Sequence, residues 1–320
     1  MLRLLTYNLE SLGERPGSPP LDARIAVLRP RLTGLAADIL CLQEIDGRHP
    51  AKGRPREPSA LQRVIAGTIY EGFHVAVTPG PDGAGVADRH NLMILSRLPI
   101  VSTRAVRHEL VAPPALRTGP FGEIAAPFDR PLLYACATLA DGQKLHLINL
   151  HLRAPLPVPI PGTHPDPGSQ SGTARWAAGY QLAAMKRSAQ ALEARLLVDR
   201  LLDEDAGALI AVCGDLNAGP TEVPVRLLTA DRSDSVEAPS AERALVPLAD
   251  AVPAERRFTV RRHGQQALVD HVLASQPLAA HCRAVEIHNQ GLADERDAEK
   301  MGANFTDSTH APMVAVFDLA

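Results

Sequence analysis

Six short segments of this 320-residue chain end an apolar run with side chains that could bind a metal ion or a phosphate group. Taken singly, each has an ordinary alternative: Asn8 could cap a turn, Asp215 and Asn217 could form an Asx-turn, and a lone histidine is more often a satisfied core or surface group. Their common position at strand ends, where scaffolds usually carry chemistry, calls for a joint explanation. The segments are TYNLE with Asn8, LCLQEID with Glu44, INLHL with His151, VCGDLNAGP with Asp215 and Asn217, LVDHVL with Asp270, and DSTHAP with His310.

Hydrolysis of a phosphate ester would require these residue types together. The reaction needs a water aimed in line with the leaving oxygen, neutralisation of charge on the phosphoryl oxygens, and a proton or metal for the leaving group. Glu44 is the strongest single carboxylate for a hard divalent cation, and Asn8 offers a carbonyl ligand or holds a water. Because Mg²⁺ takes one or two carboxylates and keeps several waters, these residues suit metal-assisted hydrolysis.

The order of the motifs resembles the endonuclease/exonuclease/phosphatase superfamily, the DNase-I-like metallophosphoesterases. Its most specific element here is GDLNAGP at 214–220, and LQE at 42–44 and LSRLPI also match. The resemblance covers the chain end to end. It implies a four-layer α/β/β/α sandwich of two mixed sheets flanked by helices, and a hydrolase that uses Mg²⁺ or Mn²⁺, as one or two ions, on a phosphate-ester substrate.

The resemblance also assigns roles to five side chains. Asp215 would orient and deprotonate the attacking water, and Asn217 would hydrogen-bond the phosphate. His310 would contact a non-bridging oxygen, while Asp270 would fix the tautomer of His310 and raise its basicity. His151 would act as a phosphate ligand or as the acid for the leaving group.

One position departs from the family pattern. In the family, the final histidine usually ends the pattern Ser-Asp-His. This chain has Ser308-Thr309-His310 there, so a neutral hydroxyl replaces a carboxylate that often binds the metal. Asp307 could partly compensate as a metal ligand, or it could be a solvated loop charge. Because a hydroxyl adds little charge to a cation site, we expect weak Mg²⁺ binding and better function with Mn²⁺.

Three weaker candidates could contact the substrate. Asn91 precedes an apolar strand and could face the phosphate or cap a turn. Asn149 lies two residues before His151 on the same strand face and could support it. Arg187, early on a long predicted helix, could reach an anionic substrate, although a solvated helix face is the more common role.

The elements that position these groups follow from the apolar pattern. Asp141 and Gly142 predict a two-residue hairpin turn between strands at 131–139 and 144–151. The prolines of segment 155–172 prevent the regular backbone hydrogen bonds of a helix or a β-sheet. This segment is therefore predicted to be an extended loop or lid. Other strands are predicted at 2–7, 39–42, 73–78, 92–95, 208–213, 268–273, 283–288 and 312–317, and helices at 22–37, 60–68 and from about 176 to 202.

The sequence predicts many strands and few helices, and this pattern favours one layered α/β sandwich over a parallel Rossmann sheet. We therefore predict a single domain over residues 1–320, with a proline-rich insertion at about 153–178. The formal net charge of −3 offers no cationic field to a polyanion, which disfavours nonspecific nucleic-acid binding. Four cysteines without CxxC pairing, no membrane-length apolar stretch and an N-terminus typical of a strand predict a cytoplasmic protein with reduced thiols. We expect a monomer, although the sequence leaves the oligomeric state open.

The substrate is less determined than the reaction, because a phosphoryl site is shared by enzymes with different substrates. Specificity is expected in the loops at 48–59, 107–130 and 153–178. With 11 aromatic residues, including one tryptophan, platforms for base stacking are scarce, which favours a small or lipid-like phosphate. A DNA-directed nuclease is the alternative. A non-catalytic phosphate-binding protein is a second alternative, motivated by Thr309 but disfavoured by retention of Asp215 and Asp270.

Overall fold

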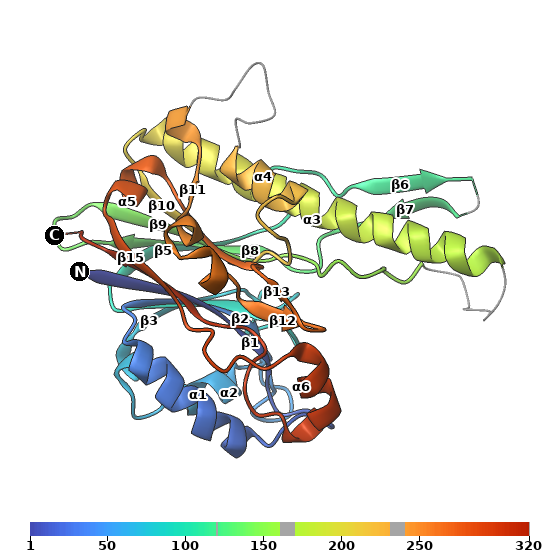
Figure 1. Cartoon of the computed structure of the whole chain (residues 1–320), viewed down its shortest axis with the longest axis horizontal. Coiled ribbons are helices and arrows are strands. Elements are labelled where there is room, and N and C mark those ends of the chain that lie inside the picture. The colour runs from blue at the N-terminus through green and yellow to red at the C-terminus, as the bar shows by residue number, and fades with distance from the viewer. Residues whose placement is uncertain (120, 161–169, 231–240, 320) are drawn as a thin grey trace.

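Two mixed sheets packed face to face form the centre of the molecule (Figure 1). The computed structural model describes residues 1–119, 121–160, 170–230 and 241–319. Within these residues the first sheet has the order β15-β16-β1-β2-β4-β3. Its strands are β1 (Leu2–Leu12), β2 (Ile39–Ile45), β3 (His74–Val77), β4 (Asn91–Ser96), β15 (Cys282–Ile287) and β16 (Met313–Phe317).

The second sheet has the order β11-β14-β10-β9-β8-β5 within the described part of the chain. Its strands are β5 (Ile100–Val106), β8 (Leu132–Thr138), β9 (Lys144–His151), β10 (Leu209–Asp215), β11 (Val246–Pro247) and β14 (Asp270–Ala274). Two small hairpins lie outside both sheets, formed by β6 (Ala115–Thr118) with β7 (Gly122–Ala125) and by β12 (Val260–Arg262) with β13 (Gln265–Ala267).

Helices cover the outer face of each sheet, giving four layers. The helices are α1 (Leu21–Leu35), α2 (Ser59–Ile65), α3 (Gln170–Glu204), α4 (Val223–Thr229), α5 (Gln276–Ala280) and α6 (Glu295–Met301). The first sheet packs on α1 and α2, the second packs on α3 and α4, and a third apolar cluster fills the space between the sheets. The predicted four-layer sandwich is confirmed.

Two local predictions need correction. The β8–β9 hairpin forms, but its loop has three residues and not two, because Leu139 N donates to Gln143 O and closes the loop around residues 140–142. Gly142, the last residue of this loop, has a positive φ of +87°. The long helix begins at Gln170, not near Trp176, so residues 170–178 of the predicted proline-rich loop are helical. No proline follows Pro167 in this segment, so nothing prevents the helix from starting early. Residues 161–169 of that loop lie outside the described residues.

All four cysteines are free, and three of them are buried. None of the described helices is long and apolar enough to cross a lipid bilayer.

A buried carboxylate on α3 anchors the chain between β5 and β6. Glu193 is fully buried, and its two oxygens accept hydrogen bonds from the backbone N–H groups of His108, Glu109, Leu110 and Val111 at 2.8–3.4 Å. This single side chain satisfies the donors of a whole turn, so the position of that turn depends on it.

We therefore expect Glu193→Ala to lower the free energy of unfolding by roughly 3 kcal/mol, because backbone donors buried without partners cost about 1–3 kcal/mol each and water will reach some of them. Glu193→Gln, whose amide oxygen still accepts, should lose less. Urea unfolding followed by circular dichroism measures both. Equal midpoints for Glu193→Ala and wild type would show that the turn is held by other contacts.

Candidate active site

A cleft of about 810 Å³ opens at the edge where the two sheets present the carboxyl ends of their parallel strands. β1 and β2 run parallel in one sheet, and β9 and β10 run parallel in the other, so the residues at or near their carboxyl ends meet at this edge. The predicted site residues that line the cleft are Glu44, His151, Asp215, Asn217, Asp307, Thr309 and His310.

Backbone geometry explains two of the motifs. At Gly214 a Cβ atom would lie 1.9 Å from the carbonyl oxygen of Leu150, and φ is +136°, so only glycine lets β10 approach β9 before Asp215. Asn217 takes the left-handed region at φ +47°, which asparagine tolerates. Glu44 lies within an irregularity of the β2–β4 register, between Leu42 and Ile45, and has φ +61°, which turns its carboxylate into the cleft.

Asp215 lies at the centre of a buried amide network. Its Oδ2 accepts hydrogen bonds from Nδ2 of Asn8 at 3.0 Å and of Asn217 at 3.1 Å, and its Oδ1 accepts from Asn217 N. Burial raises the pKa of Asp215 to about 7, and nearby Asp270 adds to this rise, while the His310 charge opposes it. A carboxylate with a pKa close to neutrality is suited to accept a proton.

Asn8 was expected to offer a carbonyl ligand or to hold a water, and in the structure both atoms of its amide bond to the protein. Its amide nitrogen also donates to Oε1 of Glu44, while its oxygen accepts from Glu10 N. Asn8 therefore holds the carboxylates of Glu44 and Asp215 in place.

His310 and Asp270 form a buried pair beside Asp215. Nδ1 of His310 lies 2.8 Å from Oδ2 of Asp270, and Nε2 lies 4.0 Å from Oδ2 of Asp215. Burial alone lowers the pKa of His310, but the charges of Asp270 and Asp215 outweigh burial and raise it to about 10. His310 is consequently a cation near neutral pH, which suits contact with a phosphoryl oxygen.

His151 is held by an arginine that the sequence did not identify. Nη1 of Arg130 lies 2.5 Å from Nδ1 of His151 and donates to it, so the imidazole carries its own proton on Nε2. Burial and the neighbouring Arg130 charge hold the pKa of His151 well below its usual range. His151 is therefore neutral, and its Nε2–H lies 3.5 Å from Glu44 and 3.6 Å from Asp215. This arrangement suits a phosphate ligand better than a leaving-group acid.

Arg130 itself lines the cleft and forms no ion pair with the described carboxylates. The adjacent Asp129 pairs with Lys186 at 2.7 Å and with Arg153 at 3.5 Å. Burial lowers the pKa of Arg130, against the opposing charges of Glu44 and Asp129, yet a guanidinium stays protonated in proteins. In the sequence, only the position of Arg130 directly before the strand predicted at 131–139 could have indicated a role in the site.

Around Thr309 the structure supplies a carboxylate from another element. Oε2 of Glu10 accepts hydrogen bonds from Thr309 N at 2.6 Å and Thr309 Oγ1 at 3.0 Å. Burial raises the pKa of Glu10, and its bonds to Thr309 oppose the rise. Asp307 lines the cleft too, but Arg31 pairs with both of its oxygens at 2.7 Å. Glu10 is thus the carboxylate placed beside the hydroxyl that replaces the family aspartate.

The three weaker candidates do not face the cleft. Asn91 is buried, and its amide bonds to the backbone of Ile45 and Ala87. Asn149 lies between the sheets and donates to the carbonyls of Leu42 and Met93.

Arg187 is also buried: it donates to the carbonyl of Asn217 and pairs with Glu222 at 3.2 Å. Arg187 therefore positions the loop that carries Asn217, whereas Asn91 and Asn149 support the sheets.

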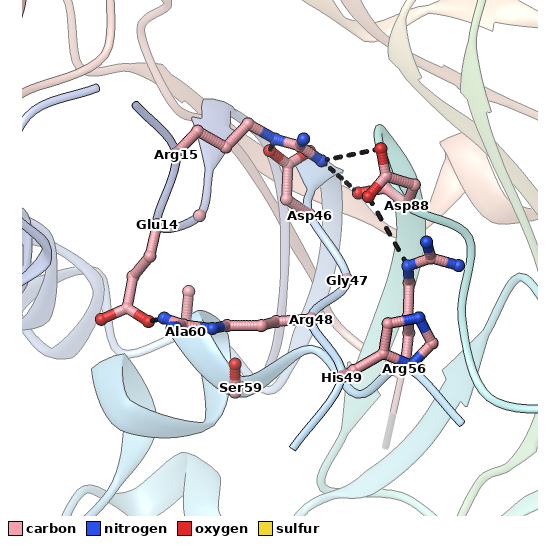
Figure 2. Close-up of a pocket in the computed structure, with 11 residues that line it drawn as sticks. Glu14, Arg15, Asp46, Gly47, Arg48, His49, Arg56, Ser59, Ala60 and Asp88 are labelled. Carbon is pink, nitrogen blue, oxygen red and sulfur yellow. Dashed lines mark hydrogen bonds and ion pairs between the residues drawn. The ribbon is translucent and has the colours of Figure 1, made fainter. Parts of the chain in front are cut away.

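Another pocket, of about 260 Å³, is smaller than the cleft and is lined in part by Arg15, Asp46 and Asp88 (Figure 2). Asp46 connects the two, because it lines this pocket and accepts a hydrogen bond from His90 N. Figure 2 shows Arg15 paired with Asp46 and Asp88, and Arg56 paired with Asp88. These described arginines are neutralised by acids, so the pocket offers little charge to an anion.

Comparison with known proteins agrees with this geometry. Residues 5–307 match the Endonuclease/Exonuclease/phosphatase family. The chain belongs to this family. Family members hydrolyse phosphoester bonds, and this chain is a hydrolase of that class. No curated protein matches the sequence.

Solved structures of the family share the fold at low sequence identity. An AP endonuclease from Archaeoglobus fulgidus is 17% identical, with a TM-score of 0.53 and all of both chains covered. Truncated TDP2 from Caenorhabditis elegans is 15% identical, with a TM-score of 0.58, covering 99% of this chain and 97% of that one. The 3′ phosphatase NExo from Neisseria, bound to a product DNA hairpin, is 17% identical, with a TM-score of 0.54, covering 99% and 100%.

The donor groups around Glu44 fit the divalent metal that family enzymes generally use. One donor atom each from Glu44, His90 and His151 lie within 4.8 Å of one another. Nδ1 of His90 is buried without a hydrogen-bond partner and lies 3.5 Å from Oε2 of Glu44. Because Nε2 of His151 carries its proton, Glu44 and His90 are the pair that would hold the ion. Sequence reasoning did not select His90, whose ring faces the site from a residue with φ +55°.

We expect Thr309→Asp to tighten Mn²⁺ binding on the order of tenfold while lowering the melting temperature of the metal-free protein. The new carboxylate attracts the cation, but it lies beside Glu10 and repels it until metal binds. Thermal melting with and without Mn²⁺, together with an activity titration, measures both effects. An unchanged half-activating concentration would place Thr309 outside the metal shell, with Glu10 or Asp307 in the role of the family carboxylate.

Proposed function

We propose that the chain is a divalent-metal-dependent phosphoesterase in which Asp215 activates the attacking water. The observation that supports this proposal is the buried Asp215 carboxylate, held by Asn8 and Asn217 opposite the cation of His310. A general base, an amide that orients it and a cation for the phosphoryl oxygens are the groups that in-line attack requires.

In the reaction, Asp215 accepts a proton from water as the water oxygen bonds to phosphorus; the bond to the leaving oxygen breaks, and that oxygen keeps the bonding electron pair and takes a proton from solvent. His310 and Arg130 neutralise charge on the non-bridging oxygens, and His151 donates a hydrogen bond from Nε2. When bound, a metal at Glu44 and His90 would act as a Lewis acid on the phosphoryl and leaving oxygens. The mixed carboxylate and imidazole donors favour Mn²⁺ over Mg²⁺.

Two substrate classes remain for this chemistry: the small or lipid-like phosphate expected from the sequence, and the nucleic acid suggested by the names of the AP endonuclease and of NExo. A non-catalytic binding protein is disfavoured, because a phosphate-binding cleft has no need of a base such as Asp215.

Turnover of bis-p-nitrophenyl phosphate tests the proposal, with Mn²⁺ or Mg²⁺ and with EDTA. Glu44→Gln should weaken Mn²⁺ binding measured by calorimetry, and the metal-free variant should melt at or above the wild-type temperature, since one of several clustered carboxylates is removed. Turnover that persists in EDTA, or unchanged Mn²⁺ affinity in Glu44→Gln, would contradict the proposal.

A further inference from the structure

The long helix α3 carries an apolar stripe on one side, interrupted midway by Arg187. At 3.6 residues per turn, Trp176, Tyr180, Ala194, Val198 and Leu201 fall within a sector of about 60°. In the carboxyl-terminal half, this stripe packs on the second sheet, and Ala194, Val198 and Leu201 are buried there. The same stripe continues to the aromatic residues in the amino-terminal half of the helix.

The aromatic end of the stripe is uncovered. Trp176 is 57% exposed and Tyr180 is 43% exposed, although their stripe is the one that faces the sheet farther along. Their rings stack with centroids 5.4 Å apart and planes at 24°. Figure 1 shows this half of α3 projecting past the sheets beside the β6–β7 hairpin. The chain thus exposes its single tryptophan where a core contact would otherwise be expected.

The segment after β9 links this exposed end to the active-site cleft. Arg187 belongs to the same sector of the helix and bonds to the carbonyl of Asn217, a cleft residue. Along the helix axis, Tyr180 lies about 10 Å and Trp176 about 16 Å beyond Arg187. The segment Arg153–Leu156 lines the cleft, and two residues later Val158 N donates to the carbonyl of Gly179, the neighbour of Tyr180.

Three cations gather around one acid beside the cleft. Arg130, Arg153 and Lys186 surround the single carboxylate of Asp129, and Arg130 and Arg153 line the cleft. This local excess of positive charge suits the phosphates of a polyanion, whereas a path for an acyl chain would lack such charges.

We propose that Trp176 and Tyr180 form a stacking platform for bases of a single-stranded nucleic acid whose scissile phosphate occupies the cleft. The proposal rests on the function proposed above and names the substrate class. Aromatic rings stack on any base, so the platform provides affinity with little sequence preference. A backbone phosphate next to the scissile one would lie against Arg153, which lines the cleft.

Binding of a single-stranded oligodeoxynucleotide to the metal-free protein in EDTA tests the platform without turnover. Because Trp176 is the only tryptophan, its fluorescence should be quenched saturably as the oligonucleotide binds. With a labelled oligonucleotide, anisotropy should show affinity losses of roughly 5- to 150-fold for Trp176→Ala and for Tyr180→Ala. Tyr180→Phe, which keeps the ring, should bind within about twofold of wild type.

Leu192→Ala, at an exposed position on the opposite side of α3, is the matched control and should bind as wild type. Unquenched tryptophan fluorescence, or unchanged affinity in both alanine variants, would overturn the platform. A fluorescence shift with phosphatidylcholine/phosphatidylserine vesicles but none with the oligonucleotide would also overturn it, in favour of a lipid surface. The platform and the proposed hydrolysis can fail independently, because bis-p-nitrophenyl phosphate turnover by the wild type tests only the latter.

Discussion

Asp215→Asn is expected to lower kcat roughly 10²- to 10⁴-fold, the usual contribution of a general base. The side chain keeps its size, and its one amide oxygen can still accept from the side-chain amides of Asn8 and Asn217 while the bond from Asn217 N is lost, so the fold should persist. Burial raises the pKa of Asp215, so its ionisation destabilises the native state as the pH rises from about 4 to about 7. The metal-free variant should therefore be as stable as wild type or more stable at pH 8.

The pH dependence gives a second readout for Asp215. Wild-type activity should rise as Asp215 loses its proton near pH 7 and fall as His310 loses its proton near pH 10. The double variant with His310→Ala should be little worse than either single variant, because both groups act on one transition state. Near wild-type turnover by Asp215→Asn between pH 6 and 9 would show that GDLN is only an Asx-turn.

Arg130→Ala should lower kcat roughly 10²- to 10³-fold, the size of effect seen when one preorganised donor to a developing oxyanion is removed. The reason is the position of Arg130: it lines the cleft, forms no ion pair with the described acids and contacts His151 at 2.5 Å. Arg130→Lys keeps the charge but loses the planar fork, so it should recover only part of the rate.

A spectroscopic signature separates a role in the site from a general structural one. Removing the Arg130 charge should raise the pKa of His151, which that charge and burial now hold low. Nuclear magnetic resonance of the imidazole protons measures this shift. Arg153→Ala, at the rim of the same cleft, is the matched control and should leave the His151 pKa in place. Equal kcat for Arg130→Ala and wild type would remove Arg130 from the reaction.

The exposed aromatic pair also changes how the composition is interpreted. Few aromatic residues made a nucleic-acid substrate less favoured, but composition counts residues without placing them. The structure puts the single tryptophan and one of four tyrosines together on the exposed surface of α3. Two well-placed rings can matter more to binding than the total number.

The sequence by itself determined the sandwich and the reaction class. Each strand carries its own apolar run, and the polar groups of β1, β2, β9 and β10 lie next to those runs, toward the carboxyl ends of the strands. Parallel neighbours bring such residues to one edge whatever the details of packing, so the grouping of Glu44, His151 and Asp215 could be predicted.

Only the tertiary structure decided which side chains turn toward that edge. Arg130 contacts His151, 21 positions away in the sequence, and Glu10 contacts Thr309, 299 positions away. Contacts between such distant positions leave no periodic pattern in a sequence. Asn149 looked equivalent to His151 on one strand face, but it lies deeper between the sheets, where β2 and β4 take up its hydrogen bonds. Residue type and order specify the available chemistry, whereas depth, register and backbone irregularities such as the one at Glu44 specify where each group points.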